Sequence, residues 1–224
     1  MAELNLLGTD AVLFDMDGTV LDTEPIYLYA WLAAVTKRGA KLPHDALEKA
    51  IGMNEKMLRA LFAELSIDHD FYNQLYRDAQ DIALEYKIKN GVSVKKGFLT
   101  FSDYLMERGV RTAIVTSTRR EQAVDDLERA GIINRFDEII AYEDAENSKP
   151  EPDPYLEAVR MLEVQAGDCL AFEDSPNGIR SAAAAGIKCV FIHDMIDLPP
   201  EARKLIMWEL DSFAEAIDFM QIAI

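Results

Sequence analysis

The chain has little cysteine, little histidine and too few basic residues to balance its acids. Its two cysteines, Cys169 and Cys189, stand within apolar runs and form neither a CxxC motif nor a Cys/His metal spacing, so we expect reduced core thiols of a cytoplasmic protein. Lys and Arg number 23 against 40 Asp and Glu, a net charge of -17. This balance argues against a nucleic-acid-binding surface, because phosphate backbones require clustered cations. His44, His69 and His193 show no triad or metal spacing and are expected to be structural or surface residues.

Long apolar runs are missing as well. No run approaches the ~20 residues of a membrane span, and the start MAELNLLGTD lacks the basic residues of a signal peptide. Half of the 224 residues are apolar and 28% are charged, which is typical of a soluble globular protein. Without such a run we expect no membrane partner. The length suits one large domain or a domain with an insertion.

Short apolar segments alternate with helical patterns from residue 93 onward. Strands alternating with helices predict βαβ units and a parallel sheet covered on both faces, an α/β fold. An apolar run near the amino terminus belongs to the same set. The strands are expected at 11–14, 112–115, 138–141, 169–172 and 188–192, and the helices at 98–108, at 121–130, from Asp153-Pro154 onward and in an Ala-rich stretch ending at Gly186.

Residues 24–90 break this alternation. Apolar residues between Leu28 and Val35 recur at i, i+3, i+4 and i+7, and a second helical stripe runs from Phe71 to Tyr86. Two further helical segments are expected at 46–51 and 55–65, and no convincing strand. The simplest account is a helical domain, residues 23–90, inserted into a core made of residues 1–22 and 91–224.

The stretch FDMDGTVLDTE, residues 14–24, places four acids directly after an apolar run. Side chains at i and i+2 of an extended segment point the same way, so Asp15 and Asp17 are expected to face one site. Ligands bind at this end of the strands in open parallel sheets. A solvated acidic turn is the alternative. A calcium loop of the EF-hand type is rejected, because aligning Gly18 with its invariant glycine puts Leu13 at the first ligand position.

Polar groups also follow the later strands. Hydroxyls follow 112–115 in Thr116-Ser117-Thr118, an ammonium stands in Ser148-Lys149-Pro150, and two carboxylates follow 169–172 in Glu173-Asp174. Each alone reads as a helix cap, a surface lysine or a solvated turn. Together they place these groups at one sheet edge with the acids of 14–24. The mixture of hydroxyl, ammonium and carboxylate groups predicts a phosphate site. It also predicts a hard cation, Mg²⁺, because two like charges 4 Å apart repel by about 4 kcal/mol at an effective dielectric of 20 and the carboxylates need a counter-charge.

These motifs resemble those of a known family. DMDGT at 15–19, VTS at 115–117, SKP at 148–150 and FEDS at 172–175 are similar, in order, to the four motifs of the haloacid dehalogenase superfamily. SKPEPDPYLEAV and EDSPNGIRSAAAAGI resemble the branch that contains β-phosphoglucomutase and related sugar phosphatases. The resemblance covers nearly the whole chain. It implies a Rossmann-like core with a helical cap inserted after the first strand.

The resemblance also implies roles for single residues. Asp15 would attack phosphorus and form an aspartyl-phosphate. Asp17 would protonate the leaving alkoxide and then activate water as a general base. Thr116 would hydrogen-bond a phosphoryl oxygen, and Lys149 would hold Asp15 ionised and neutralise developing charge.

The metal and phosphate ligands follow from the same resemblance. Mg²⁺ would be bound by Asp15, by the backbone carbonyl of Asp17 and by Asp174, with Glu173 helping directly or through water. Gly18, which allows a sharp exit from the strand, and Ser117 would complete the phosphate-binding groups with Thr116 and Lys149.

The predicted function is a Mg²⁺-dependent phosphatase for small phosphorylated metabolites, sugar or polyol phosphates. Asp17 favours phosphoryl transfer over dehalogenation, which needs no leaving-group acid. A phosphosugar mutase of the β-phosphoglucomutase type is the alternative. The mutase branch carries a His where this chain has Tyr27, and an Arg three residues after the glycine matching Gly52, where this chain has Glu55. An acid there would repel a second phosphate.

Two rivals come from other classes. A phospho-acceptor signalling domain also combines Asp, Mg²⁺, Thr and Lys, but it is shorter and lacks the acid two residues after its acceptor. A phosphatase for phosphorylated proteins is disfavoured by the helical insertion, which should shut out a folded partner. We expect a small-molecule phosphorylated substrate, selected by residues near Tyr27, 52–55 and 87–89, and a monomer or weak homo-oligomer.

Overall fold

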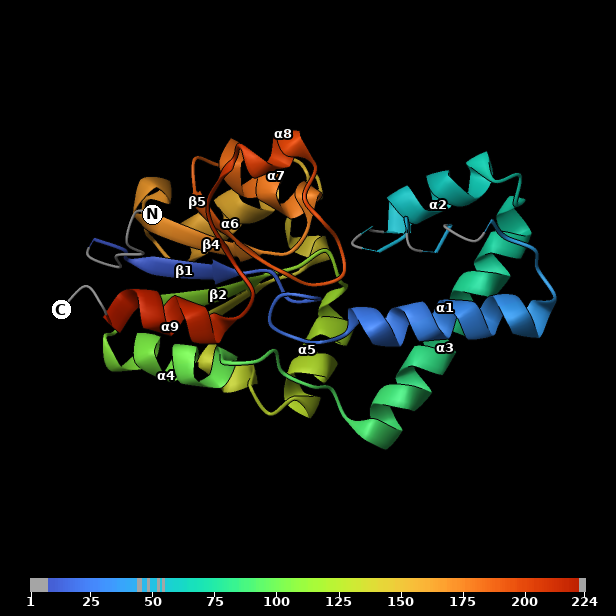
Figure 1. Ribbon diagram of the computed structural model, residues 1–224, viewed down its shortest axis with the longest axis horizontal. Coiled ribbons are helices and arrows are strands. Elements are labelled where there is room, and N and C mark those ends of the chain that lie inside the picture. Colours follow the sequence, from blue (N-terminus) through green and yellow to red (C-terminus); the bar gives the residue numbers. More distant parts are fainter. Residues whose placement is uncertain (1–7, 44–45, 48, 52, 54, 222–224) are drawn as a thin grey trace. The chain divides into compact units, whose positions relative to one another are not determined.

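The computed structural model describes residues 8–43, 46–47, 49–51, 53 and 55–221, and it divides into two compact units (Figure 1). The core unit comprises Met1–Leu21 and Val94–Ile224, and the helical unit comprises Asp22–Ser93. The division into a core domain of residues 1–22 and 91–224 and a helical domain of residues 23–90 stays a prediction. No described helix is long and apolar enough to cross a membrane.

The core unit contains a six-stranded sheet with the order β3-β2-β1-β4-β5-β6, and all neighbouring strands are parallel. The predicted α/β fold with a parallel sheet is thus confirmed. β1 lies between β2 and β4, so the chain that leaves β1 emerges between the ends of those two strands. The strands are β1 (Ala11–Phe14), β2 (Arg111–Val115), β3 (Glu138–Ile140), β4 (Cys169–Glu173), β5 (Lys188–Ile192) and β6 (Ile206–Leu210).

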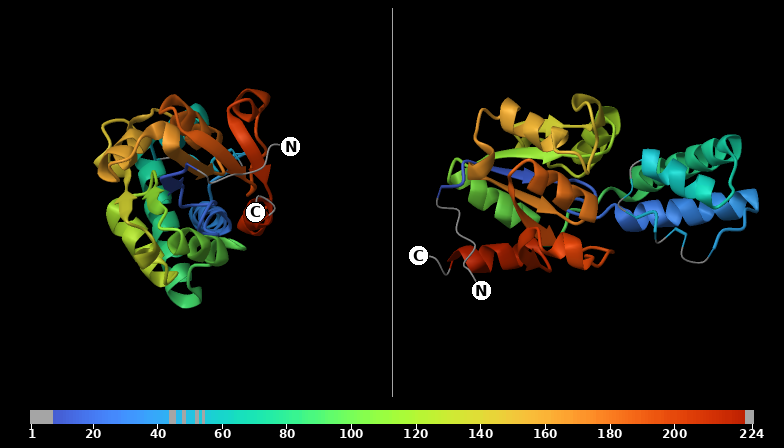
Figure 2. Two further views of the ribbon diagram at one scale, coloured as in Figure 1. Left: turned by 90° about the vertical axis from the view of Figure 1, so that its left-hand side faces the viewer. Right: turned by 90° about the horizontal axis from the view of Figure 1, so that it is seen from above.

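Helices cover both faces of this sheet (Figures 1 and 2). Because successive side chains of a strand point to opposite faces, Leu13 and Phe14 enter two different apolar layers. Leu13 packs in a cluster with residues of α6 and α7, and Phe14 stacks among aromatic rings that include those of α4 and α9. The helices and turns of the core unit are α4 (Phe98–Glu107), α5 (Arg120–Arg129), η1 (Ile133–Arg135), η2 (Tyr142–Asp144), α6 (Asp153–Met161), η3 (Ala166–Asp168), α7 (Pro176–Ala184), α8 (Pro200–Arg203) and α9 (Phe213–Gln221).

The aromatic layer fixes the position of β1. The Phe14 ring lies 5.4 Å from that of Phe98 and 5.5 Å from that of Phe172, measured between centroids. Burial of each such side chain contributes about 1.5–3 kcal/mol. The packing of Phe14 therefore holds the carboxyl end of β1, and with it the residues that follow directly, in a fixed position in the sheet.

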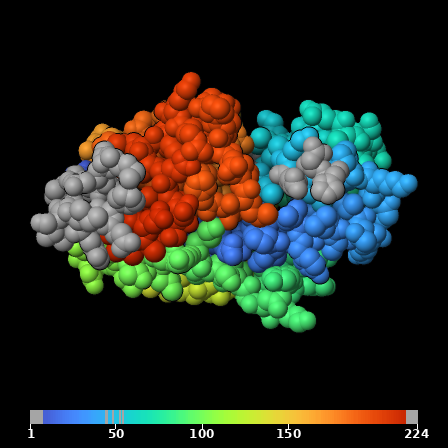
Figure 3. All heavy atoms as spheres, in the orientation of Figure 1, coloured from blue at the N-terminus to red at the C-terminus, as the bar shows by residue number. Residues whose placement is uncertain are grey.

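The predicted elements of the core agree with the structure to within one or two residues. The helix expected to begin with Asp153 as its cap instead has Pro152 at that position and Asp153 as its first residue. β6, α8 and α9 were not predicted. They follow β5, and these segments, orange to red, form much of the core unit's surface in the view of Figure 3.

The helical unit contains α1 (Glu24–Arg38), α2 (Glu55–Glu64) and α3 (His69–Asn90). α1 carries Pro25 in its first turn and ends at Gly39, whose φ of 64° suits a glycine cap. Asp68 caps α3 by accepting hydrogen bonds from the backbone N–H of Asp70 and Phe71. An aromatic cluster that includes Trp31, Phe62 and Tyr72 forms the interior.

One predicted helix of this unit is wrong. The described residues between 46 and 51 form turns, although Ala46, Leu47 and Ala50 are buried. These side chains are buried from turns, so apolar spacing over so short a segment does not by itself specify a helix. No strand occurs among the described residues of the unit, as expected. The predictions for His44 and Gly52 lie outside the described residues.

Candidate active site

Lys149 joins the ends of three strands. Its Nζ donates hydrogen bonds to Asp15 Oδ1 at 2.6 Å, to Glu173 Oε1 at 2.6 Å and to the carbonyl of Val115 at 2.7 Å. Its side chain is only 5% exposed. Burial opposes its charge, but Asp15 and Glu173 prevail and raise the pKa of the ammonium above its usual range. Lys149 is therefore a permanent cation at this edge of the sheet.

Glu173 is completely buried and held on all sides. Besides Lys149, its Oε1 accepts a hydrogen bond from the Tyr155 hydroxyl at 2.7 Å, and its Oε2 accepts one from Ser175 Oγ at 3.3 Å. A Cβ at Gly178, in the first turn of α7, would lie 1.9 Å from Oε2. Burial raises the pKa of Tyr155 well above its ordinary value, so its hydroxyl stays a donor. The Glu173 carboxylate thus anchors Lys149.

Asp15 follows β1 directly, and its backbone N–H donates to the carbonyl of Phe172 at 2.9 Å. Its side chain is 13% exposed. Burial raises the pKa of the Asp15 carboxyl well above its ordinary value, Lys149 opposes this, and the charges of Glu173 and Asp17 add to it. A further cation beside Asp15 would lower this pKa and keep the carboxylate ionised.

The residues present fit a divalent cation. Asp15, Glu173 and Asp174 each place one carboxylate oxygen within 4.8 Å of the others. Asp174 is buried, and its Oδ1 accepts a hydrogen bond from Thr19 Oγ1 at 3.1 Å. An all-oxygen donor set of this kind suits Mg²⁺. Because both oxygens of Glu173 already accept hydrogen bonds, Asp15 and Asp174 are the better placed direct ligands.

Asp17 meets the loop that follows β2. Its Oδ2 accepts a hydrogen bond from Thr118 Oγ1 at 2.7 Å. Within the loop the Thr118 backbone N–H donates to Thr116 Oγ1 at 3.0 Å, and Ser117 lies between the two threonines. Gly18 has a φ of 80°, and its N–H donates to the carbonyl of Leu21 at 2.8 Å, which closes a tight turn after β1.

This set of motifs on this sheet corresponds to a known family model. Residues 12–192 match the model for haloacid dehalogenase-like hydrolases. The chain belongs to this family. The expected family membership is confirmed, and so is the expectation that the protein is an enzyme.

Known proteins similar to this hydrolase include a phosphatase and a putative pyrophosphatase. It is 27% identical over 195 residues to a phosphorylated carbohydrates phosphatase of Thermotoga maritima, covering 84% of this chain and 88% of that protein. It is 34% identical over 184 residues to the putative pyrophosphatase PpaX of Caldanaerobacter subterraneus, covering 81% and 80%. The crystal structure of CbbY from Rhodobacter sphaeroides in complex with phosphate superposes with a TM-score of 0.76 at 25% identity, covering 92% and 96%.

Three residues around the site of this hydrolase were not predicted to serve it. Thr118 could have been found from its place in the Thr116–Thr118 run. Thr19 lies in the DMDGT motif and Tyr155 in the stretch SKPEPDPYLEAV, but no role at the site was predicted for either residue. Their contacts arise only because α6 and the turn after β1 are brought against β4.

The residues expected to select the substrate pair within the helical unit. Lys87, at the end of α3, is buried, and its Nζ donates to the hydroxyl of Tyr27 at 3.3 Å. Glu55 Oε1 accepts a hydrogen bond from Arg59 Nη2 at 3.1 Å. The position expected to repel a second phosphate therefore combines an acid with a neighbouring guanidinium.

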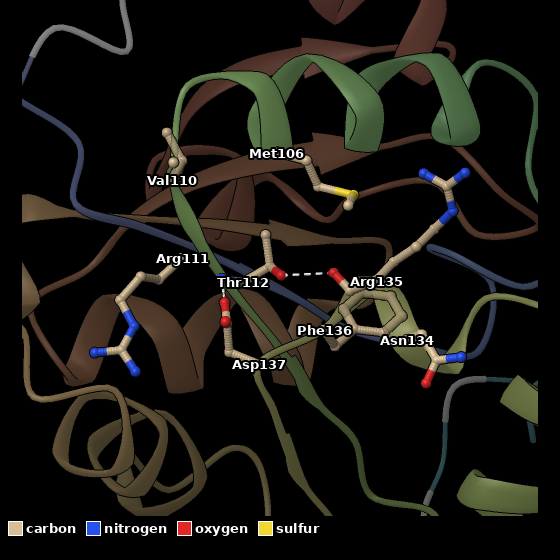
Figure 4. Close-up of a pocket in the computed structure, with 9 residues that line it drawn as sticks. Met106, Val110, Arg111, Thr112, Asn134, Arg135, Phe136 and Asp137 are labelled. Carbon is tan, nitrogen blue, oxygen red and sulfur yellow. Dashed lines mark hydrogen bonds between the residues drawn. The ribbon is translucent and has the colours of Figure 1, made fainter.

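A cavity of about 260 Å³ lies in the core unit at the amino end of β2 (Figure 4). Thr112 donates there to Asp137 through its N–H and to the carbonyl of Arg135 through its Oγ1. The Arg135 guanidinium is engaged by Asp103, and that of Arg111 donates to the carbonyl of Leu162. The charged side chains named here are already paired. The cluster of Asp15, Lys149 and Glu173 lies at the opposite, carboxyl end of the strands.

Proposed function

We propose that this hydrolase is a Mg²⁺-dependent phosphatase for small phosphorylated metabolites, sugar or polyol phosphates, and that it works through an aspartyl-phosphate on Asp15. The observation that carries this proposal is the Lys149 ammonium, 2.6 Å from Asp15, beside the converging oxygens of Asp15, Glu173 and Asp174. The phosphatase relative that acts on phosphorylated carbohydrates supports the substrate class.

In the first step an Asp15 oxygen forms a bond to phosphorus while the ester P–O bond breaks. Asp17, oriented by the hydroxyl of Thr118, gives its proton to the departing alkoxide. Thr116 and Ser117 bind phosphoryl oxygens, and Gly18 lets the backbone approach them. Lys149 stabilises the charge that develops.

In the second step Asp17, now a carboxylate, takes a proton from water, which attacks the aspartyl-phosphate. Inorganic phosphate leaves and Asp15 is restored. Mg²⁺ would be held by Asp15, Asp174 and the backbone carbonyl of Asp17, where it would supply positive charge that offsets the phosphate dianion. Glu173 acts indirectly, because its hydrogen bonds with Lys149, Tyr155 and Ser175 keep the ammonium in place.

The test is phosphate release from a panel of phosphorylated metabolites, with Mg²⁺ and with EDTA. Turnover should stop in EDTA and return with added Mg²⁺, and Asp15→Asn should abolish it while the melting curve stays cooperative. Mass spectrometry of acid-quenched enzyme should find the phosphoryl group on Asp15 only transiently. Full turnover in EDTA would disprove the metal role, and a stable phosphoryl group without turnover would instead support the signalling alternative.

A phosphosugar mutase is the second candidate, because Arg59 lies beside Glu55 and offers a cation for a second phosphate. Glu55 partly neutralises that cation, and Tyr27 stands where the mutase branch carries a His, so we favour hydrolysis. β-Glucose 1-phosphate with a trace of the bisphosphate should yield free sugar and inorganic phosphate by phosphorus NMR. Glucose 6-phosphate formed faster than phosphate would establish the mutase.

We also propose a cytoplasmic location. It is supported by Cys169 and Cys189, which are free and buried. Burial raises the pKa of the Cys169 thiol to about 11 and that of Cys189 well above its ordinary value. Both thiols therefore stay protonated and suit a reducing compartment. The monomer or weak homo-oligomer stays a prediction, which light scattering would test.

A further inference from the structure

Asp194 is a buried carboxylate that none of the family motifs includes. It lies two residues after β5, and its side chain is 6% exposed. Its Oδ1 accepts a hydrogen bond from Lys95 Nζ at 2.6 Å. Its Oδ2 is buried and has no hydrogen-bond partner among the described residues. A buried acceptor left in this way is unfavourable unless a donor from outside the protein reaches it.

This unpartnered oxygen points toward the turn after β1. A Cβ built at Gly18 would lie 3.0 Å from Asp194 Oδ2 and 2.3 Å from Asp174 Oδ2. The two carboxylates therefore converge on the position that a side chain at residue 18 would occupy. β4 and β5 are neighbours in the sheet, with Glu173 opposite Phe191, which explains why the residues after both strands share one edge. Asp194 thus faces a residue to which we assign metal binding.

The charges at this position select the kind of ligand. Lys95 already neutralises Asp194, so a second cation between Asp174 and Asp194 would compete with an ion pair that exists. A neutral O–H donor would satisfy Oδ2 without disturbing that pair. Mg²⁺ in proteins usually keeps several of its waters, and carboxylates that accept hydrogen bonds from a metal's ligands tune its affinity.

We propose that Asp194 is a positioning residue of the metal site, accepting a hydrogen bond from a metal-bound water in the space beside Gly18. This inference rests on the Mg²⁺ dependence in the proposed function. Lys95 holds the Asp194 carboxylate in place from its other oxygen. A glycine at position 18 is then required because a Cβ would collide with the Asp174 and Asp194 carboxylates, as well as for its backbone conformation.

The experiment measures Mg²⁺ affinity by calorimetry on the full chain. Asp194→Asn should raise Kd by about 10–100-fold, the usual cost of losing such a group. Lys95→Met breaks the same ion pair but keeps the acceptor and frees its negative charge, so its Kd should equal that of the wild type or fall below it. Asp103→Asn is the matched control, since it breaks a pair with Arg135 at a side chain that is 59% exposed. Its Kd should not change.

The outcomes separate the possible roles. Equal rises in Kd for Asp194→Asn and Lys95→Met would overturn the proposal and leave a structural ion pair. If Asp194→Asn folds poorly because Lys95 loses its partner, the double variant Lys95→Met/Asp194→Asn leaves no unpaired charge and should show the same rise. Unchanged affinity in that variant overturns the role of Asp194 alone, whereas a wild type that binds no Mg²⁺ overturns the metal proposal as well.

Discussion

Replacing Lys149 by methionine should expose how much this cation contributes. The change removes three hydrogen bonds, to Asp15, to Glu173 and to the carbonyl of Val115, from a side chain that is almost fully buried. Removing one partner of a buried ion pair typically costs 3–5 kcal/mol, because the remaining charge is left uncompensated. We expect a loss of about that size in the free energy of unfolding near pH 7, measured in EDTA.

The loss should depend on pH in a defined direction. Burial already raises the pKa of Asp15, and Lys149 opposes that rise, so the variant's carboxyl pKa moves further up. A carboxyl whose pKa is higher in the folded state than its unfolded value of about 3.9 destabilises the protein as pH rises through the folded pKa. The deficit of Lys149→Met relative to wild type should therefore be small near pH 4 and grow toward pH 8.

Urea denaturation at several pH values checks the stability, and phosphate release checks the chemistry. Loss of a positioned charge that stabilises the transition state should lower kcat by about 10²–10³. Lys188→Met, at the exposed start of β5, is the control and should change neither quantity. A deficit that is the same at low and high pH, or turnover equal to that of the control, would refute this account of Lys149.

Three further changes test separate contacts. Asp17→Asn should lower kcat about 10²–10⁴-fold on alkyl phosphates. It should slow the first step less on an aryl phosphate, whose leaving group needs no proton. Stopped-flow measurement of the burst rate tests this, and an equal fall in the first-step rate for both substrates would contradict the acid role. Gly178→Ala forces a methyl group to within 1.9 Å of Glu173 Oε2 and should cost about 1–3 kcal/mol by overpacking, whereas Gly167→Ala, with open space around it, should not alter the melting temperature. Hydrogen bonds from Arg38 and Lys37 hold the pKa of Asp78 below its ordinary value. Asp78→Asn should therefore lower the free energy of unfolding by roughly 1 kcal/mol at neutral pH. This loss should vanish as pH falls through the folded pKa of Asp78, and an equal loss in strong acid would contradict the role of these hydrogen bonds.

The sequence by itself determined the elements of the core and the order of its motifs. Apolar runs such as Ala11–Phe14 and Lys188–Ile192 are visible because a strand buried on both faces needs apolar residues at successive positions. Asp15 and Glu173 were expected at one site because polar groups at the carboxyl ends of such runs gather at one edge of a parallel sheet. Lys149, in the loop after β3 and η2, was placed with them by its SKP motif. β6, with the sequence IMWEL, was missed because three successive apolar residues, one acid and a leucine over five positions do not distinguish a strand from a helical segment.

Only the tertiary structure decided which of these groups touch. Lys149 pairs with Glu173 as well as Asp15 because β4 lies directly beside β1, and strand order depends on packing between segments more than 100 residues apart. The same packing seats Tyr155 on Glu173 and turns Asp194 toward Gly18, contacts without any local pattern in the sequence. Hydrophobic periodicity reports which face of an element is buried, whereas the partner of a buried polar group is set by where the whole chain places the neighbouring elements.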